Sequence, residues 1–230
     1  MHLILTNRLK TAADLVRHNK KTVDVGTDHG YLPAFLVMSG KTDCAIAADI
    51  GVGPLENAKK TIEKYGLENK IDTILSNGLD KIPHDTEEII IAGMGGTLIC
   101  EILEKAPWIK HKGIHLVLQP MTHAHDVRKF LCENGFYIDA EKFCTDDARD
   151  YVVISAYYNG EKTERDDFFY FFGDFISAET ETEKAYIKRQ YFYIKSRFDG
   201  LKKSGNDEEA AAFEKILSAI QSKTDWSEFI

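Results

Sequence analysis

The chain has 230 residues, of which 43% are apolar and 11% aromatic, a composition that suits a globular domain with or without a smaller appended unit. It contains no apolar run of about eighteen residues, and its first residues are too polar for a signal peptide, so no membrane segment is expected. A net charge of −8 argues against indiscriminate binding to nucleic acid. The four cysteines are widely spaced without a Cys-x-x-Cys pair, which favours reduced thiols in the cytoplasm.

Residues 1–160 alternate between helical and strand-like patterns. An amphipathic helix is predicted over residues 8–18. Strands are expected at residues 22–25, 44–49, 71–76, 88–92, 115–119, 136–143 and 151–158, and the clearest helices between them at 31–38, 54–65, 97–104 and 124–134. Such alternation predicts an α/β fold with a parallel sheet.

The last two expected strands break this alternation. Residues 144–150 leave no room for a helix, so we expect an antiparallel hairpin at one edge of the sheet. Seven strands ending in a hairpin favour the Rossmann-like fold of class I S-adenosylmethionine-dependent methyltransferases over a plain dinucleotide-binding fold.

Residues 161–230 show only helical patterns. Their first long stripe has the spacing of a coiled-coil seam and is followed by a break at 204–206 and a second stripe. The two stripes consist of Ile187, Tyr191, Ile194, Phe198 and Leu201, and of Phe213, Ile216, Leu217 and Ile220. We therefore expect a second domain that is an antiparallel helical coiled-coil hairpin.

A glycine-bracketed turn follows the first strand. Gly26 and Gly30 enclose Asp28, and the second strand ends on a carboxylate, Asp49. This arrangement is typical of sites for nucleoside-bearing cofactors, in which backbone approaches the ligand and the acid accepts ribose hydroxyls. Asp28 would repel a phosphate but suits an ammonium group, which S-adenosylmethionine carries. The alternatives are that Asp28 caps the following helix and that Asp49 is an ordinary turn residue.

Two further strand ends carry polar or glycine-rich turns. Asn77-Gly78-Leu79 would suit the edge and face of an adenine, although a plain Asn-Gly turn is an alternative. Gly93-Met94-Gly95-Gly96 ends a buried strand, which indicates close approach of a ligand where a methyl acceptor would meet the cofactor, or a turn needed only for packing. Gln119 ends the next strand and offers an amide that could read a base edge.

No metal site is expected. The histidine pairs at 111 and 115 and at 123 and 125 have no carboxylate or cysteine at complementary spacing.

These motifs together resemble the bacterial tRNA (adenine-22-N1)-methyltransferases, the TrmK family. The shared segments are Gly26 to Tyr31, Asp49 with Gly53-Pro54-Leu55, Gly93 to Gly96, and Leu118 to Pro120, and the likeness covers essentially the whole chain. One departure is visible: the family usually has Gly-Asp-Gly-Leu where this chain has Ser76-Asn77-Gly78-Leu79. Asn77 can accept a hydrogen bond through its carbonyl oxygen but carries no charge.

The resemblance implies transfer of a methyl group from S-adenosylmethionine to N1 of an adenine in the tRNA D-loop. Neutral N1 already has a lone pair, so catalysis would rest on alignment and exclusion of water, and the base must be unpaired or flipped. Cofactor binding is expected from Asp24, Gly26, Thr27, Asp28, His29, Gly30, Asp49, Ile50, Asn77, Gly78, Leu79 and Gly93, and the catalytic candidates are Asp28, His29, Gly93 and Met94.

A basic segment distinguishes the second domain from the acidic chain as a whole. Residues 184–203 contain seven lysines and arginines and one acid, Asp199. We expect Lys188, Arg189, Lys195 and Arg197 to bind RNA, with Tyr186 and Tyr193 available to stack on bases. The alternative is a solvated coiled-coil face.

Two other functions remain open on the sequence. A nicotinamide-dependent oxidoreductase would share the first strand–turn–helix unit and the ribose acid, although Asp28 disfavours a phosphate there. A non-enzymatic module could sense the cofactor and recruit a partner through its helices. Cofactor titration and methyl transfer to tRNA separate these possibilities.

Overall fold

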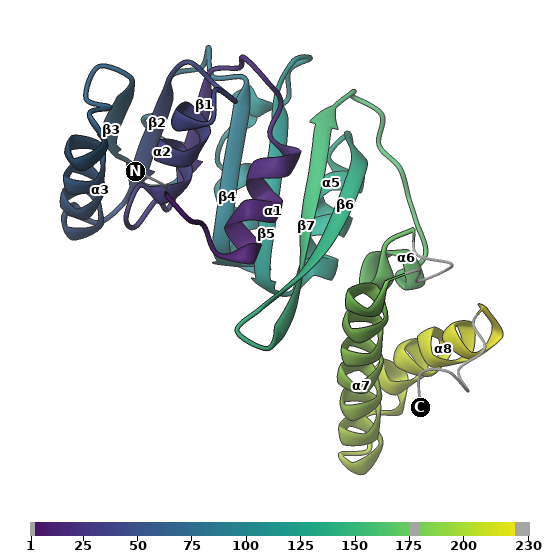
Figure 1. Ribbon diagram of the computed structural model, residues 1–230. Coiled ribbons are helices and arrows are strands. Elements are labelled where there is room, and N and C mark those ends of the chain that lie inside the picture. Colours follow the sequence, from purple (N-terminus) through teal and green to yellow (C-terminus); the bar gives the residue numbers. More distant parts are fainter. Residues whose placement is uncertain (1–2, 175–179, 224–230) are drawn as a thin grey trace. The chain divides into compact units, whose positions relative to one another are not determined.

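The computed structural model describes residues 3–174 and 180–223, which fall into two compact units, Met1–Glu164 and Arg165–Ile230 (Figure 1). The elements of the first unit are α1 (Asn7–Leu15), β1 (Thr22–Val25), α2 (Tyr31–Met38), β2 (Ala45–Asp49), α3 (Val52–Tyr65), β3 (Ile71–Leu75), β4 (Glu88–Gly95), α4 (Gly96–Glu104), the 3-10 turn η1 (Pro107–Ile109), β5 (His115–Thr122), α5 (Ala124–Glu133), β6 (Phe136–Asp146) and β7 (Arg149–Tyr158). Those of the second are α6 (Asp167–Phe172), α7 (Glu181–Lys203) and α8 (Asp207–Lys223).

The seven strands form one mixed sheet in the order β3-β2-β1-β4-β5-β7-β6. The first five strands are parallel, and β7 pairs antiparallel with both β5 and β6. The predicted seven-stranded sheet with a terminal hairpin is therefore confirmed. The order reverses at β1 and β4, and at such a switch point the carboxyl ends of the strands leave a crevice for a ligand.

The hairpin is longer than the sequence pattern predicts. Strands β6 and β7 stay paired as far as Asp146 and Arg149, so the expected loop at 144–150 was wrong. Only Asp147 and Ala148 turn the chain, with φ of 47° and 58°. Two residues with positive φ match the twist of a hairpin, but alanine gives no sequence signal for this conformation.

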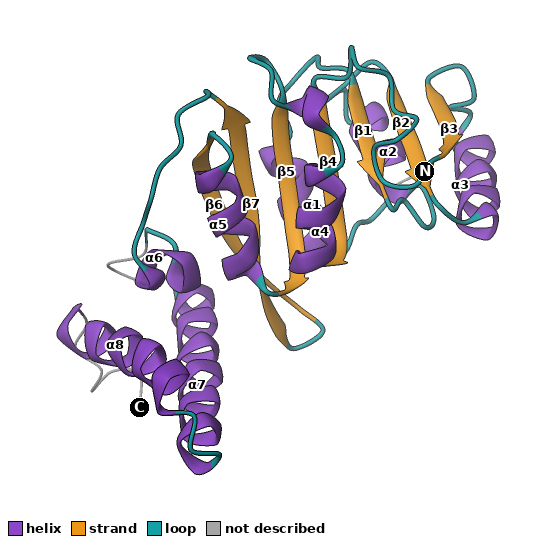
Figure 2. Ribbon diagram, turned by 180° about the vertical axis from the view of Figure 1, so that it is seen from behind, coloured by secondary structure: helices purple, strands orange, loops and turns teal. Residues whose placement is uncertain are grey.

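Helices cover both faces of the sheet. Helix α1 lies in front of the sheet in Figure 1, and α4 and α5 lie in front in the reverse view of Figure 2. Helices α1 and α2 pack on Ile90, Val117 and Val153 of the central strands, and α2 and α3 enclose a second apolar cluster over β2. This core holds the strand ends in fixed register.

Some element boundaries differ from those expected. Helix α1 ends at Leu15 rather than at residue 18, because the chain turns so that Arg17 bonds the buried carboxylate of Glu88 through backbone and side chain. Strand β4 runs to Gly95 and β5 to Thr122, with irregular pairing around Met94. The irregularity lies at the carboxyl end of β4, where Gly93 has a φ of 86°.

The second unit is entirely helical among its described residues. Thr180 and Glu183 form a capping box that fixes the start of α7. The apolar stripe of α7 includes Ile187, Tyr191 and Ile194. It packs on α6 and on α8, where Ile216 belongs to the same cluster. The second predicted stripe and the first as far as Ile194 thus meet in one cluster, which does not include Phe198 and Leu201. The supercoil of a coiled coil stays a prediction.

Candidate active site

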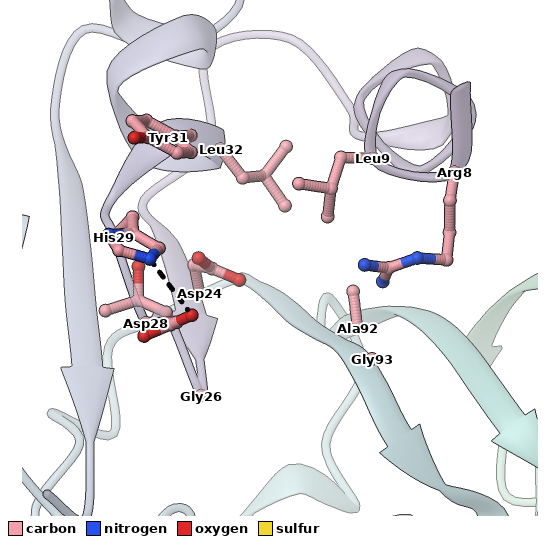
Figure 3. Close-up of a pocket in the computed structure, with 11 residues that line it drawn as sticks. Arg8, Leu9, Asp24, Gly26, Asp28, His29, Tyr31, Leu32, Ala92 and Gly93 are labelled. Atoms are coloured by element: carbon pink, nitrogen blue, oxygen red, sulfur yellow. Dashed lines mark ion pairs between the residues drawn. The ribbon is translucent and has the colours of Figure 1, made fainter. Parts of the chain in front are cut away.

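A cavity of about 320 Å³ lies at the carboxyl ends of the central strands (Figure 3). Strand β1, the turn after it, the start of α2, the end of β4 and the start of α1 supply its walls. The lining residues are Arg8, Leu9, Asp24, Gly26, Thr27, Asp28, His29, Tyr31, Leu32, Ala92 and Gly93. The structure therefore brings together six of the predicted cofactor residues: Asp24, Gly26, Thr27, Asp28, His29 and Gly93.

The glycines of the turn meet steric and conformational demands. Gly26 has a φ of 80°, and a side chain there would collide with the methyl group of Met94. Gly30 has a φ of 67°, and a Cβ atom would lie 3.1 Å from the backbone of Ala58. Only glycine satisfies both the positive φ and the lack of room for a side chain at these two positions.

Met94, a predicted catalytic residue, packs across Gly26 and does not line the cavity.

Asp24 is the buried acid of the cavity. The pKa of Asp24 is raised to about 6, chiefly by burial and to a smaller extent by the Asp49 carboxylate, against the opposing effects of the Thr27 hydroxyl and the Arg8 guanidinium. The Thr27 hydroxyl is also buried and forms no hydrogen bond of normal geometry with any described residue. A buried carboxylate with a buried hydroxyl beside it, both lining the cavity, favours a ligand that brings positive charge and polar groups.

Asp28 and His29 form the outer side of the turn. Both are exposed, and Asp28 adopts a φ of 42°, which is uncommon for a residue other than glycine. The His29 Nε2 atom lies 3.4 Å from Asp28 Oδ2, and the His29 ring stacks on Tyr31 at 5.3 Å between centroids (Figure 3). A stacked imidazole and phenol at the cavity mouth present flat surfaces on which a base could rest.

Arg8 closes the opposite side of the cavity. Its Nη1 donates to Gln119 Oε1 at 2.7 Å, and the same oxygen accepts the Gly93 amide at 3.0 Å. A Cβ atom at Gly93 would lie 3.1 Å from Arg8 Nη1, so glycine at that position makes room for the guanidinium. Gln119 is fully buried, and its amide nitrogen donates to Pro120 O. The prediction that Gln119 reads a base edge was therefore wrong; it fixes Arg8 and the Gly93 loop.

The remaining predicted cofactor residues lie on the next strand ends, outside the cavity lining. Asp49 Oδ1 accepts the Gly51 amide at 2.7 Å, and Asp49 O accepts the Ser76 amide at 2.9 Å, which ties the ends of β2 and β3 together. Ile50 and Asn77 are exposed beside them. Leu79 is buried, and a Cβ atom at Gly78 would press on Ile102. Asp49, Ile50 and Asn77 thus form an open rim, whereas Gly78 and Leu79 face packed side chains.

Sequence reasoning missed five residues of the lining: Arg8, Leu9, Tyr31, Leu32 and Ala92. Leu9 and Leu32 read as ordinary apolar positions of two helices, and Arg8 precedes the apolar side of α1 without a local motif. Their role arises from tertiary packing, which brings α1 against β4 and β5. The one local signal was Tyr31, which directly follows the glycine turn.

Within the ranges 3–174 and 180–223, no group of three histidine, cysteine or acidic side chains is arranged to hold a metal ion. His115, one of the histidines considered as a metal ligand, is buried and bonded to Glu88 and Ser155. No helix among the described residues is long and apolar enough to cross a membrane.

The predicted RNA-binding cations lie on the exposed face of α7. Lys188, Arg189, Lys195 and Arg197 are all exposed. Tyr186 is only 1% exposed, so the prediction that it stacks on bases was wrong; instead the Arg189 guanidinium lies 5.5 Å from its ring centre. Tyr193 is exposed, as stacking on a base would require, and so is its neighbour Phe192. Stacking by Tyr193 stays a prediction.

The sheet order, the terminal hairpin and the cavity at the glycine turn define a Rossmann-like methyltransferase. The family model described as "Methyltransferase domain" matches residues 5–154. The tRNA (adenine(22)-N(1))-methyltransferase of Bacillus subtilis is 36% identical over 155 residues, which are 67% of this chain. The match covers 65% of that relative, which is less than two thirds of its length.

Solved structures extend the likeness to the helical unit. The structure of the B. subtilis M1A22 tRNA methyltransferase TrmK is 26% identical, with a TM-score of 0.85 over 97% of this chain and all of that one. A Streptococcus pneumoniae putative tRNA (m1A22) methyltransferase, solved with S-adenosyl-L-methionine, is 29% identical, with a TM-score of 0.79 over 93% of this chain and 100% of that one. The chain belongs to the family of these bacterial tRNA methyltransferases, as its motifs predicted.

Proposed function

We propose that this protein transfers a methyl group from S-adenosylmethionine to N1 of an adenine in the D-loop of tRNA. The observation that supports it most directly is the cavity itself, in which buried Asp24 and the exposed carboxylate of Asp28 face the guanidinium of Arg8 (Figure 3). Opposite charges across one small cavity suit an α-amino acid group with its ammonium and carboxylate. Nicotinamide dinucleotides carry phosphates, which the two carboxylates lining the cavity would repel.

The residues present fit the cofactor at both of its ends. Asp24 and Asp28 would hold the ammonium group, Arg8 the carboxylate, and the unsatisfied Thr27 hydroxyl offers one further hydrogen bond. At the neighbouring strand end, Asp49 would accept ribose hydroxyls and Asn77 would meet the adenine amine.

S-adenosylmethionine supplies an electrophilic methyl group on a sulfonium. Adenine N1 needs no general base, so the protein's work is to orient the base and keep water out. The His29–Tyr31 stack would provide a surface for the flipped base, and Gly93 makes room for the Arg8 guanidinium on the opposite side of the cavity. The positive charge that passes to the purine would be stabilised by the carboxylates of Asp24 and Asp28.

Mass spectrometry of tRNA nucleosides tests the proposal directly. The full chain is incubated with unmodified tRNA transcript and either S-adenosylmethionine or NAD. We expect 1-methyladenosine only with S-adenosylmethionine, and none when A22 of the transcript is replaced by G. Binding of the cofactor without any methylated nucleoside would instead support a non-enzymatic sensing module.

The exposed cations of α7 are proposed to hold the tRNA. Reversal of Lys188, Arg189, Lys195 and Arg197 to glutamate should weaken tRNA binding and make its salt dependence shallower, because fewer counterions are released. Cofactor binding should be unaffected. Gel shifts at several ionic strengths measure the slope.

A matched control reverses four exposed lysines of the first unit, Lys59, Lys60, Lys64 and Lys70, which changes the net charge by the same amount. Identical slopes for the parent protein and the α7 variant would contradict the RNA-binding role.

A tRNA substrate and four free cysteines also favour a cytoplasmic location, which we include in the proposal.

A further inference from the structure

The middle of α7 carries two neighbouring aromatic rings that are both exposed. Phe192 is 49% exposed and Tyr193 is 41% exposed. The apolar stripe that packs on α8, which includes Ile187, Tyr191 and Ile194, lies on the other side of the helix. A single exposed apolar residue is common on protein surfaces, but two adjacent rings within a row of cations are not.

Ion pairs among the described residues engage one cation near each end of α7 and none in its middle. Near the start, Lys184 Nζ pairs with Glu181 at 3.1 Å, and near the end Lys202 Nζ pairs with Asp207 at 2.9 Å. Between them, Lys188, Lys195 and Arg197 form no ion pair with another described residue. Residues 184–198 contain no acid. The stretch around the two exposed rings therefore carries positive charge without an acidic partner among the described residues.

Helical spacing places the cations around the rings. Phe192 has Lys188 one turn before it and Lys195 one turn after it, at i−4 and i+3. Tyr193 has Arg189 and Arg197 at i−4 and i+4. The Phe192 ring also meets Tyr191 edge to face, with 5.5 Å between centroids, which limits the orientations of Phe192.

From this arrangement we infer that Phe192 and Tyr193 form a stacking platform for unpaired tRNA nucleotides, with the flanking cations holding the adjoining phosphates. The inference rests on the proposed function and adds the kind of RNA that α7 recognises. Cations alone would serve a duplex, whose bases are stacked on one another and closed to a ring on a helix surface. Aromatic rings beside cations are the usual means of holding single strands.

The test separates rings from charge by measuring binding across a salt series. Phe192→Leu keeps the apolar volume and loses the ring, whereas Phe192→Trp keeps a ring. Tyr137→Leu is the matched control, because Tyr137 is 52% exposed on β6 of the first unit. Each full-length variant is titrated with tRNA transcript and with an RNA duplex of equal length.

We expect Phe192→Leu to weaken tRNA binding about tenfold at every salt concentration with an unchanged slope, because stacking releases no counterions. Phe192→Trp should bind as the parent does, and the duplex and Tyr137→Leu should show no change. Unchanged affinity of Phe192→Leu for tRNA would overturn the platform. So would a parent protein that self-associates in sedimentation while Phe192→Leu does not, because the patch would then be a contact between copies.

These outcomes are distinct from failure of the proposed function. If the parent forms 1-methyladenosine and Phe192→Leu binds tRNA as tightly, only the platform fails. If the parent forms none, the proposed function fails whatever Phe192 does. Circular dichroism of each variant shows whether α7 remains helical.

Discussion

The two ends of the central strands carry polar clusters of opposite character. At the carboxyl ends, Asp24 and Thr27 line an open cavity, with a raised pKa on the acid and no normal hydrogen bond to the hydroxyl. At the amino ends, Glu88 and His115 begin β4 and β5 and are just as buried, but they are fully engaged with their neighbours.

The cluster at the amino ends is a closed chain of hydrogen bonds. Glu88 accepts from Arg17 Nε at 2.8 Å and lies 2.5 Å from His115 Nδ1. His115 Nε2 lies 2.8 Å from Ser155 Oγ, and this hydroxyl donates to Asp139 Oδ1 at 2.8 Å. An acid, an imidazole and a serine in sequence resemble a hydrolytic triad, yet Ser155 is buried and the cavity lies at the other end of the strands.

The comparison teaches that residue type alone does not identify a functional group. Both clusters contain buried acids, and their surroundings separate them: Glu88 is bonded to Arg17 and His115, whereas Asp24 faces an open cavity. A satisfied network stabilises and specifies the fold, whereas a buried group left unsatisfied costs stability and is retained where a ligand completes it.

The largest expected effect tests the closed cluster. Glu88→Ala leaves Arg17 and His115 without their acid and should lower the free energy of unfolding by about 3–5 kcal/mol. The affinity of the remaining folded protein for S-adenosylmethionine should not change. Urea unfolding and calorimetric titration measure the two quantities.

Glu87→Ala is the matched control for this experiment. Glu87 is the adjacent residue, pairs with Lys20 at the surface and should cost at most about 1 kcal/mol. If Glu88→Ala lowered the free energy of cofactor binding by more than it lowered the free energy of unfolding, the two ends of the strands would not be functionally separate.

Removal of the charge on the acid of the open cluster, Asp24, should stabilise the fold, whereas loss of Glu88 should destabilise it. The pKa of Asp24 is about 6 in the fold and near 3.8 in the unfolded chain, so between these values the folded state binds more protons. The contribution of Asp24 to stability is therefore most favourable below about pH 4 and is lost as the pH rises to about 6. Asp24→Asn should raise the free energy of unfolding at pH 7.5 by about 2–3 kcal/mol.

The same substitution should weaken the affinity for S-adenosylmethionine. In the parent protein that affinity should also fall below about pH 6, because Asp24 must lose its proton to face a cation, whereas Asp24→Asn should lack this pH dependence. If the parent and Asp24→Asn had the same free energy of unfolding at pH 7.5, the ionised Asp24 carboxylate would not destabilise the fold as we expect.

The sequence predicted the open cluster better than the closed one. The glycines around Asp28 form a local pattern after the first strand, so six predicted residues meet in the cavity. Glu88 and His115 look like ordinary strand starts, because their partners come from residues 17, 139 and 155.

Arg8 escaped prediction for the same reason, since its bond to Gln119 spans 111 positions. The short turn at Asp147 and Ala148 escaped because alanine gives no signal for positive φ. Local patterns thus predicted the strands and the glycine turn, whereas contacts between distant segments required the structure.

A smaller effect is expected at the rim of the cavity. Asp49→Ala removes the proposed bond to ribose hydroxyls and should weaken S-adenosylmethionine binding by about 1.5–3 kcal/mol. It also removes the acceptor of the Gly51 amide, so Asp49→Asn is the control that keeps an acceptor there. If both variants bind the cofactor as the parent does while remaining folded, Asp49 is a turn residue.

The smallest expected effect concerns Asp28, which is exposed and therefore screened by water. If Asp28 holds the ammonium group, Asp28→Asn should weaken binding of S-adenosylmethionine and of S-adenosylhomocysteine equally, by about 1 kcal/mol, because both carry that group. If it serves the acceptor instead, both affinities should hold and only the turnover of tRNA should fall. His29→Gln is a useful companion, since it removes the partner 3.4 Å from the carboxylate without touching its charge. Binding of both nucleosides and turnover that all match the parent would leave Asp28 as a turn residue, held at its positive φ by the geometry of the loop.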